Sequence, residues 1–127
     1  MPSLKIKMFG VVYFAAPIPT YETEFYDEAE AYIKERAKEV ISVRGLYQSG
    51  AHFVRTYRGH VDRCSQLIFI TTPLGFIGRG VFEEIEYFKL MKKKPVIRLT
   101  RTYDLVERPD ITLYERGESW INYATVS

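Results

Sequence analysis

Cysteine is nearly absent from this sequence: Cys64 is the one cysteine among 127 residues. No disulfide can form within such a chain, so a small fold held by disulfides is excluded and a reducing cytoplasm is the expected environment. Long apolar runs are also absent, because none approaches the roughly 20 residues of a membrane span. The segment Met1 to Lys7 lacks the apolar core of an export signal. We therefore expect no membrane partner.

A strong charge of either sign is likewise missing. Eighteen Lys and Arg residues stand against sixteen Asp and Glu residues, which leaves a formal net charge of +2. Such a small excess gives no general reason to expect a nucleic-acid partner. The run Lys92 to Lys94 is basic, but it is more simply explained as the cationic last turn of a helix, with nucleic-acid contact a remote second.

The composition that remains is that of a globular protein, with 46% hydrophobic and 27% charged residues. A chain of this length suits one core, so we expect a single α/β domain over residues 1–127. The apolar run Ile6 to Ala16 predicts a strand, with Val11 to Phe14 buried on both faces. Pro17 and Pro19 end it, and Thr20 is placed to cap the following helix.

Helical spacing of apolar residues predicts that this helix extends from Tyr21 to Ser42. Ala51 to Val54 reads as a short strand, and apolar positions from Val54 to Cys64 indicate a few turns of helix. A second buried strand is expected at Leu67 to Thr71. Beyond it, Val81, Ile85, Phe88 and Met91 form a helical stripe, and the segment Val96 to Leu99 is the next strand.

Strands that alternate with helices favour parallel pairing with right-handed crossovers. The predicted fold is therefore a three-layer, doubly wound, mostly parallel sheet of the Rossmann or flavodoxin-like class. The tail differs, because Ile111 to Glu115 and Trp120 to Val126 flank the turn-like segment Arg116 to Ser119. This pattern predicts a hairpin-like C-terminal extension.

Two segments should meet at the carboxyl ends of the parallel strands, where ligands bind in such sheets. They are Ala15 to Pro17 and the loop Pro73 to Gly80, which contains Gly75, Gly78 and Gly80. The glycine spacing does not match the dinucleotide fingerprint, and no Lys-Ser or Lys-Thr pair of a phosphate loop is present. Classical dinucleotide binding and ATP hydrolysis are therefore disfavoured.

Parts of the chain resemble a known family, the nucleoside 2-deoxyribosyltransferases, with their relatives that hydrolyse the N-glycosidic bond of deoxynucleoside monophosphates. Tyr13 to Pro17 looks like the family's first strand, which ends at the substrate pocket. The segments Leu67 to Pro73, Gly80 to Phe88 and Lys94 to Ile97 follow the family's order and spacing. About 45 of 127 residues carry the likeness.

This resemblance implies that Glu84 is the catalytic nucleophile, which attacks the anomeric carbon and holds the sugar as a glycosyl ester. A carboxylate in the first turn of a helix, where Glu84 is expected, is kept ionised by the helix dipole and by N–H groups, as a nucleophile must be. The bond-breaking step passes through an oxocarbenium-like state that the carboxylate stabilises. The expected substrate-binding residues are Tyr13, Ala16, Pro17, Gly75, Gly78, Arg79 and Gly80. The ligand would be a small nucleoside or nucleotide, with no cofactor.

Each assignment has a simpler alternative. Glu84 can be one of several helix-capping carboxylates beside Glu83 and Glu86, and Tyr13 can be a core residue. Arg79 either holds a phosphate at the helix entrance or remains solvated. The chain also departs from the family pattern at Val81, at Glu86 and at Gly78 with Arg79, where an acidic residue that binds the base usually stands.

His60 and Cys64 are four residues apart, but two ligands do not make a closed metal site, so we expect no metal. Three functions therefore stay open. The first is an enzyme acting on N-glycosidic bonds, and the second is a nucleotide-binding module of the same fold without turnover. The third is a homo-oligomeric interaction protein, because ten Tyr, eight Phe and one Trp can supply aromatic surface for a copy of the chain.

Overall fold

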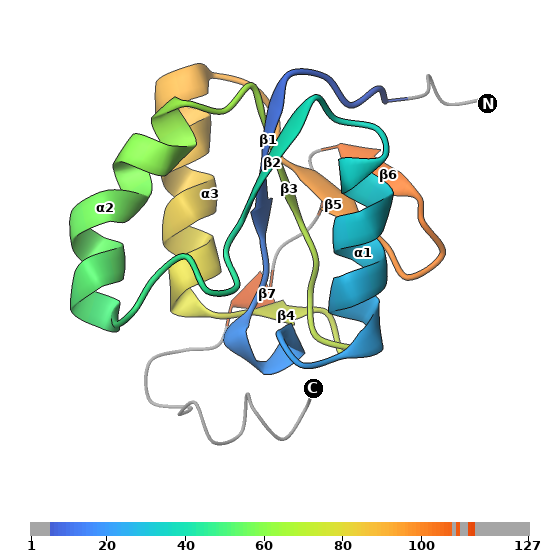
Figure 1. Ribbon diagram of the computed structural model, residues 1–127, viewed down its shortest axis with the longest axis horizontal. Helices are drawn as coiled ribbons and strands as arrows, with labels where there is room; N and C mark the ends of the chain where they lie inside the picture. Colours follow the sequence, from blue (N-terminus) through green and yellow to red (C-terminus); the bar gives the residue numbers. More distant parts are fainter. Residues whose placement is uncertain (1–5, 108, 110–111, 114–127) are drawn as a thin grey trace.

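The computed structural model describes residues 6–107, 109 and 112–113. A five-stranded sheet in the order β2-β1-β3-β5-β6 forms its centre, and three α-helices cover it (Figure 1). The protein is thus α/β, of the Rossmann or flavodoxin-like class predicted from the sequence. In chain order the elements are β1 Val11–Ala15, η1 Ile18–Thr20, α1 Glu24–Lys34, β2 Glu39–Ser42, α2 Gly50–Asp62, β3 Gln66–Phe69, β4 Phe76–Ile77, α3 Arg79–Lys92, β5 Ile97–Leu99, β6 Leu105–Glu107 and β7 Thr112–Leu113.

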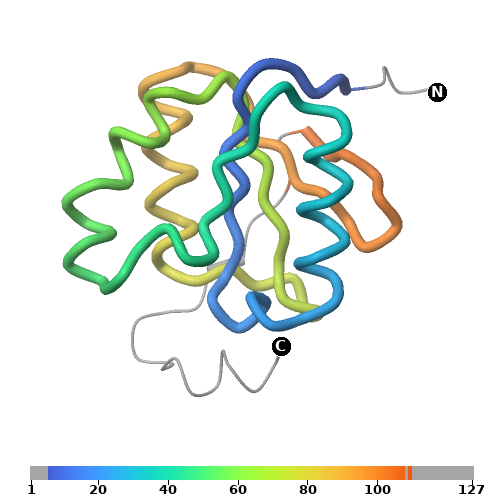
Figure 2. Tube along the Cα trace, viewed as in Figure 1, coloured from blue at the N-terminus to red at the C-terminus, as the bar shows by residue number. Residues whose placement is uncertain are grey.

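Strand β1 is central, as its continuous apolar sequence predicts. It pairs in parallel with β2 on one side and with β3 on the other. The chain leaves β1 toward β2 and later returns across β1 to β3, so the winding direction reverses between β1 and β3. Right-handed crossovers then place α1 on one face of the sheet and α2 with α3 on the opposite face, as the chain trace shows (Figure 2). This reversal opens the crevice in which ligands of such sheets bind.

The first helix is shorter than the sequence pattern suggested. Helix α1 ends at Lys34, and residues up to Ser42, predicted as helical, include the edge strand β2. The backbone N–H groups of Lys38 and Glu39 both donate to the carbonyl of Gly10, which begins the pairing beside β1. The β-branched pair Val40 and Ile41 suits this strand, so pairing with β1 overrides the helical spacing.

Two further local predictions were wrong. Thr20 does not cap α1, because it lies in η1 and Thr23 is the capping residue, accepting a hydrogen bond from the N–H of Tyr26. The segment Ala51 to Val54 is not a strand but the first turn of α2, whose N-cap is Ser49. The run from Ala51 to Val54 pairs with no described strand, and Ser49 instead caps a helix by accepting a hydrogen bond from the N–H of His52.

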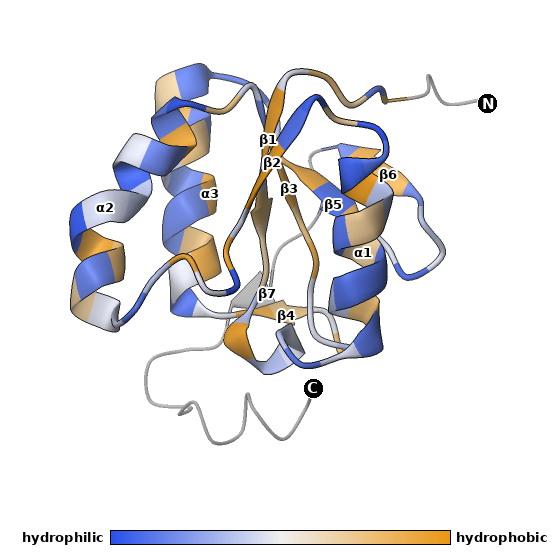
Figure 3. Ribbon diagram, in the orientation of Figure 1, coloured by the Kyte–Doolittle hydropathy of each residue, from blue (hydrophilic) through white to orange (hydrophobic). Residues whose placement is uncertain are grey.

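Apolar residues concentrate on the strands and on the helix faces turned toward them (Figure 3). The largest fully buried side chains include Tyr13, Phe14, Phe69 and Phe88. Antiparallel β6 closes one edge of the sheet beside β5. The short strands β4 and β7 pair in parallel beyond the main sheet (Figure 1). Most of the predicted C-terminal hairpin lies outside the described residues, apart from β7.

Candidate functional site

A cavity of about 900 Å³ opens at the carboxyl ends of β1 and β2, between the segment after β1, helix α2 and the start of α3. One wall comes from Ala16, Pro17 and Ile18, which follow β1. The opposite walls come from the N-terminal half of α2 and from Gly78 to Val81. Cavities of a few hundred to about 1,000 Å³ are the usual size for small-molecule and cofactor sites. The cavity therefore lies at the carboxyl edge of the sheet, beside β1, and has the size of a ligand pocket.

Glu84 contributes the buried acidic group of this cavity. Its side chain lines the cavity although only 2% of the residue is exposed, because it lies in the second turn of α3 and points toward β1. The hydroxyl of Tyr13, in the middle of β1, donates a hydrogen bond to Glu84 Oε2. The hydroxyl of Tyr47 lies 2.7 Å from that of Tyr13. A chain of three polar groups thus runs from the cavity wall at Tyr47 to the buried carboxyl.

Burial raises the pKa of Glu84 to about 8, and the hydrogen bond from Tyr13 opposes that rise. This corrects the expectation that the helix dipole keeps the carboxylate ionised: Glu84 is past the first turn, where the dipole acts most strongly, and desolvation dominates. Burial, then the charge of Glu84, also raises the pKa of the Tyr13 hydroxyl well above its usual range. Near neutral pH the Glu84 carboxyl and the Tyr13 hydroxyl therefore stay mostly protonated, until a positive charge nearby stabilises the ionised carboxylate.

Aromatic rings form the α2 wall of the cavity. The rings of Phe53 and Tyr57 stack, with centroids 4.6 Å apart and an interplanar angle of 8°. Tyr47 meets Phe53 edge to face, with centroids 4.9 Å apart. The start of α3 packs against this wall at Gly80, where a Cβ would make an ordinary van der Waals contact of 3.7 Å with Phe53 Cζ. Flat apolar faces of this kind suit a planar ring of a ligand.

Two arginines lie where the cavity meets solvent. Arg79 is 61% exposed in its side chain and forms an ion pair with Glu83, whose Oε2 is 3.2 Å from Arg79 Nε. The guanidinium of Arg58 lies over the rings of Tyr57 and Tyr87, at 5.7 and 5.4 Å from their centroids. Their charges give the rim a positive potential, partly neutralised by Glu83. An anionic group of a ligand would be attracted to this rim.

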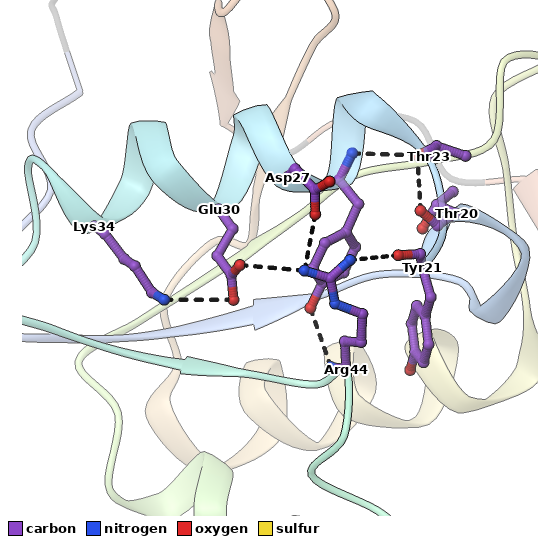
Figure 4. A network of polar contacts seen from close by, with 8 residues as sticks. Thr20, Tyr21, Thr23, Asp27, Glu30, Lys34 and Arg44 are labelled. Atoms are coloured by element: carbon purple, nitrogen blue, oxygen red, sulfur yellow. Dashed lines mark hydrogen bonds and ion pairs between the residues drawn. The ribbon is translucent and has the colours of Figure 1, made fainter.

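A polar network on α1 fixes the part of the wall formed by Tyr21. Arg44, just after β2, forms ion pairs with Asp27 and Glu30 and donates a hydrogen bond to the carbonyl of Tyr21. Figure 4 shows the Arg44 guanidinium between the α1 carboxylates and the Tyr21 backbone. The ring of Tyr26 lies beneath the same guanidinium, 4.2 Å from ring centroid to Cζ. The segment after β1 is thereby tied to both α1 and β2.

Most residues predicted for the site surround this one cavity. Ala16, Pro17, Gly78, Arg79, Gly80 and Glu84 line it. Tyr13 is fully buried behind Glu84, so it contacts the catalytic candidate rather than the open space. Gly75 is not among the lining residues; it has a φ of +88° in the turn after β3, which accounts for glycine there. Of the three neighbouring glutamates, Glu84 is the buried one, whereas the Glu83 and Glu86 side chains are 40% and 49% exposed.

The aromatic wall was missed by sequence reasoning. Phe53 and Tyr57 are four residues apart, which would have indicated one helix face, but the strand prediction at 51–54 hid that spacing. Tyr47 lies in a loop, and no periodic pattern marks it.

No metal centre accompanies the site within the described residues, where no group of three or more His, Cys, Asp or Glu side chains converges. Cys64 is buried and its thiol donates to the carbonyl of His60, so this pair is locally satisfied. Nor does any helix in the described part of the chain have the length and apolarity that crossing a membrane requires.

Comparison with known proteins adds nothing to this geometry, since no family model, no curated protein and no solved structure matches the chain. What the cavity can do chemically has to follow from its own residues: a buried carboxyl with a raised pKa, two tyrosine hydroxyls beside it, a stacked aromatic wall and a cationic rim.

Proposed function

We propose that the protein cleaves or transfers the N-glycosidic bond of a nucleoside or nucleoside monophosphate, with Glu84 as the nucleophile. The observation that carries the proposal is the buried Glu84 carboxyl, bonded to Tyr13, in a cavity with a stacked aromatic wall. The base would lie against Phe53 and Tyr57, where ring stacking is worth about 1–3 kcal/mol per base. The sugar would then lie toward Glu84.

The chemistry has two displacements. The ionised Glu84 Oε attacks the anomeric carbon, the bond from that carbon to the base nitrogen breaks, and the base leaves with the bonding electron pair and takes up a proton from solvent. Water, or a second base, then attacks the same carbon and loses a proton to solvent, while the ester bond to Glu84 breaks and restores the carboxylate; water gives the free sugar and a second base gives a new nucleoside. The covalent route replaces one difficult displacement with two easier ones.

The raised pKa of Glu84 is compatible with this role, because the carboxylate is stabilised by the positive charge that forms during the reaction. At pH 7 a carboxyl with a pKa of about 8 is ionised in roughly one molecule in ten. The oxocarbenium-like transition state places positive charge beside the carboxylate, and that charge favours the ionised form in a site with little water. The carboxylate therefore interacts more strongly with the transition state than with the uncharged sugar of the bound substrate, which is the condition for catalysis.

A cationic rim would suit a phosphate on the ligand. Arg79 is the first residue of α3, where free backbone N–H groups add to its charge. Its ion pair with Glu83 is exposed, so exchange for a phosphate oxygen costs little. Arg79 is accordingly the residue that we assign to the phosphate of a monophosphate substrate.

A binding module without turnover is the second candidate. The same raised pKa favours it, because a mostly protonated Glu84 could donate a hydrogen bond to a bound base or sugar rather than attack it. Such a protein would bind the same ligands through the aromatic wall but release no base.

Base release separates the two candidates. Purified protein would be incubated with purine and pyrimidine deoxynucleosides and their monophosphates, and free base measured by chromatography. Wild-type protein should release base from at least one of them, and Glu84→Gln should lower that rate by a factor on the order of 1,000 or more. The matched variant Glu83→Gln should lose less than about tenfold, because its carboxylate is at the rim. Ligand binding without base release by the wild type would overturn catalysis and leave the binding module.

A further inference from the structure

A second cluster of cationic side chains lies outside the cavity, at the carboxyl ends of β3 and β5. Arg98 comes from the middle of β5, and Arg101 from the turn that follows it. Both approach Thr71: Arg98 Nη2 lies 3.1 Å from Thr71 Oγ1, and Arg101 Nη2 lies 3.3 Å from the Thr71 carbonyl. Arg101 also stacks over Phe25 of α1, 4.3 Å from the ring centroid. The cluster is therefore on the α1 side, whereas α2 and α3 enclose the cavity.

These two cations have no carboxylate partner among the described residues. No ion pair of the described part of the chain includes Arg98 or Arg101. Two nearby acids along the chain and on α1 are engaged elsewhere: Asp104 accepts from the hydroxyl of Thr102, and Glu28 accepts from that of Tyr103. Partial burial and the charge of Arg98 lower the pKa of Arg101. The arginines are thus held close together in spite of their repulsion.

One donor of the cluster is also left unused. Arg98 Nε is buried and makes no hydrogen bond to any described residue. A buried donor without an acceptor costs free energy, and such a group in a folded protein calls for an explanation by a ligand, an ion or water. Here it stands close to a second guanidinium, so that two positive charges and several N–H groups lie near one another. Thr71 positions both arginines as an acceptor, and its own hydroxyl donates to the carbonyl of Thr72.

We propose that Arg98 and Arg101, positioned by Thr71, form a binding site for a phosphate group, carried either by free inorganic phosphate or by a small phosphate ester. Guanidinium groups match phosphate because they donate two parallel N–H bonds to its oxygens. A dianion balances two arginine charges, which a single carboxylate does not. The site is separate from the N-glycosidic chemistry proposed above and does not depend on it, since none of its three residues lines the cavity.

The test is the dissociation constant for inorganic phosphate, measured by calorimetry with chloride at matched ionic strength as the blank. Arg101→Gln and Arg98→Gln should each raise that constant about tenfold or more, because each removes a charge-assisted hydrogen bond. Arg101→Lys keeps the charge and should lose less. Arg63→Gln, at an exposed arginine paired with Glu39, should bind phosphate like the wild type.

A second arm replaces inorganic phosphate with glycerol phosphate. If the wild type binds either ligand and Arg101→Gln loses that binding, the site is supported. The ligand that binds shows whether the site takes the free phosphate ion or a phosphate ester. Arg101 is exposed, so this variant is expected to fold even if Arg98→Gln does not. Absence of binding by the wild type, or binding that persists in Arg101→Gln, overturns the proposal.

Discussion

Burial of the Glu84 carboxyl makes the stability of the fold depend on pH. The carboxyl is buried against Tyr13, so ionising it in the folded protein is unfavourable, whereas in the unfolded chain the same group ionises near its ordinary pKa of 4.5. The folded protein therefore binds this proton more tightly than the unfolded chain does. Ionisable groups with strongly shifted pKa values are frequent at the active sites of proteins.

This difference predicts a pH-dependent stability that Glu84→Gln removes. As pH rises from about 4.5 to about 8, the unfolded chain loses the proton and the folded protein keeps it, so the free energy of unfolding falls. The slope is at most about 1.4 kcal/mol per pH unit, and above pH 8 the contribution is constant. Urea unfolding of the wild type and of Glu84→Gln between pH 5 and 9 measures it.

The difference between the two proteins isolates Glu84 from all other titrating groups. Glu84→Gln should gain stability relative to the wild type as pH rises toward 8. Glu83→Gln is the matched control and should keep the wild-type pH dependence, because Glu83 is a rim side chain outside the buried cluster. Parallel curves for the wild type and Glu84→Gln would show that the buried carboxyl does not titrate as described.

At the scale of elements, the sequence predicted the buried strands better than the helices between them. Strands β1 and β3 are buried on both faces, and a continuous apolar run indicates such a strand directly. The end of α1 could not be found from spacing, because it depends on Gly10 accepting two hydrogen bonds from residues 38 and 39. Helix α2 begins at a serine cap that was overlooked next to an apolar, strand-like run.

The capping of α1 gives a prediction at this scale. Thr23→Ala removes the hydroxyl that accepts from the N–H of Tyr26 at 3.2 Å, and N-cap losses of this kind cost about 1 kcal/mol. Thermal unfolding should occur about 4 °C lower in a domain of this size. An unchanged midpoint would mean that Thr23 does not stabilise the helix.

For the whole molecule, the order of strands explains why distant residues share one site. Parallel pairing of β1 with β3 brings the segment after β1 to the loop before α3, although about 60 residues separate them. The sequence could predict this meeting from the two strand-to-loop patterns. It could not predict which helix would close the cavity, because the α2 wall depends on how Phe53 and Tyr57 pack on Gly80 and Tyr47.

The central claim is that Glu84 carries the sugar as a covalent ester, and the anomeric configuration of a trapped product tests it most directly. A deoxynucleoside that the protein cleaves would be turned over in a water–methanol mixture, and the methyl deoxyriboside identified by NMR. Two displacements at the anomeric carbon restore the original configuration, so we predict the β-anomer from a β-nucleoside. Formation of the α-anomer would mean a single displacement by solvent, with no ester on Glu84, and would contradict the account.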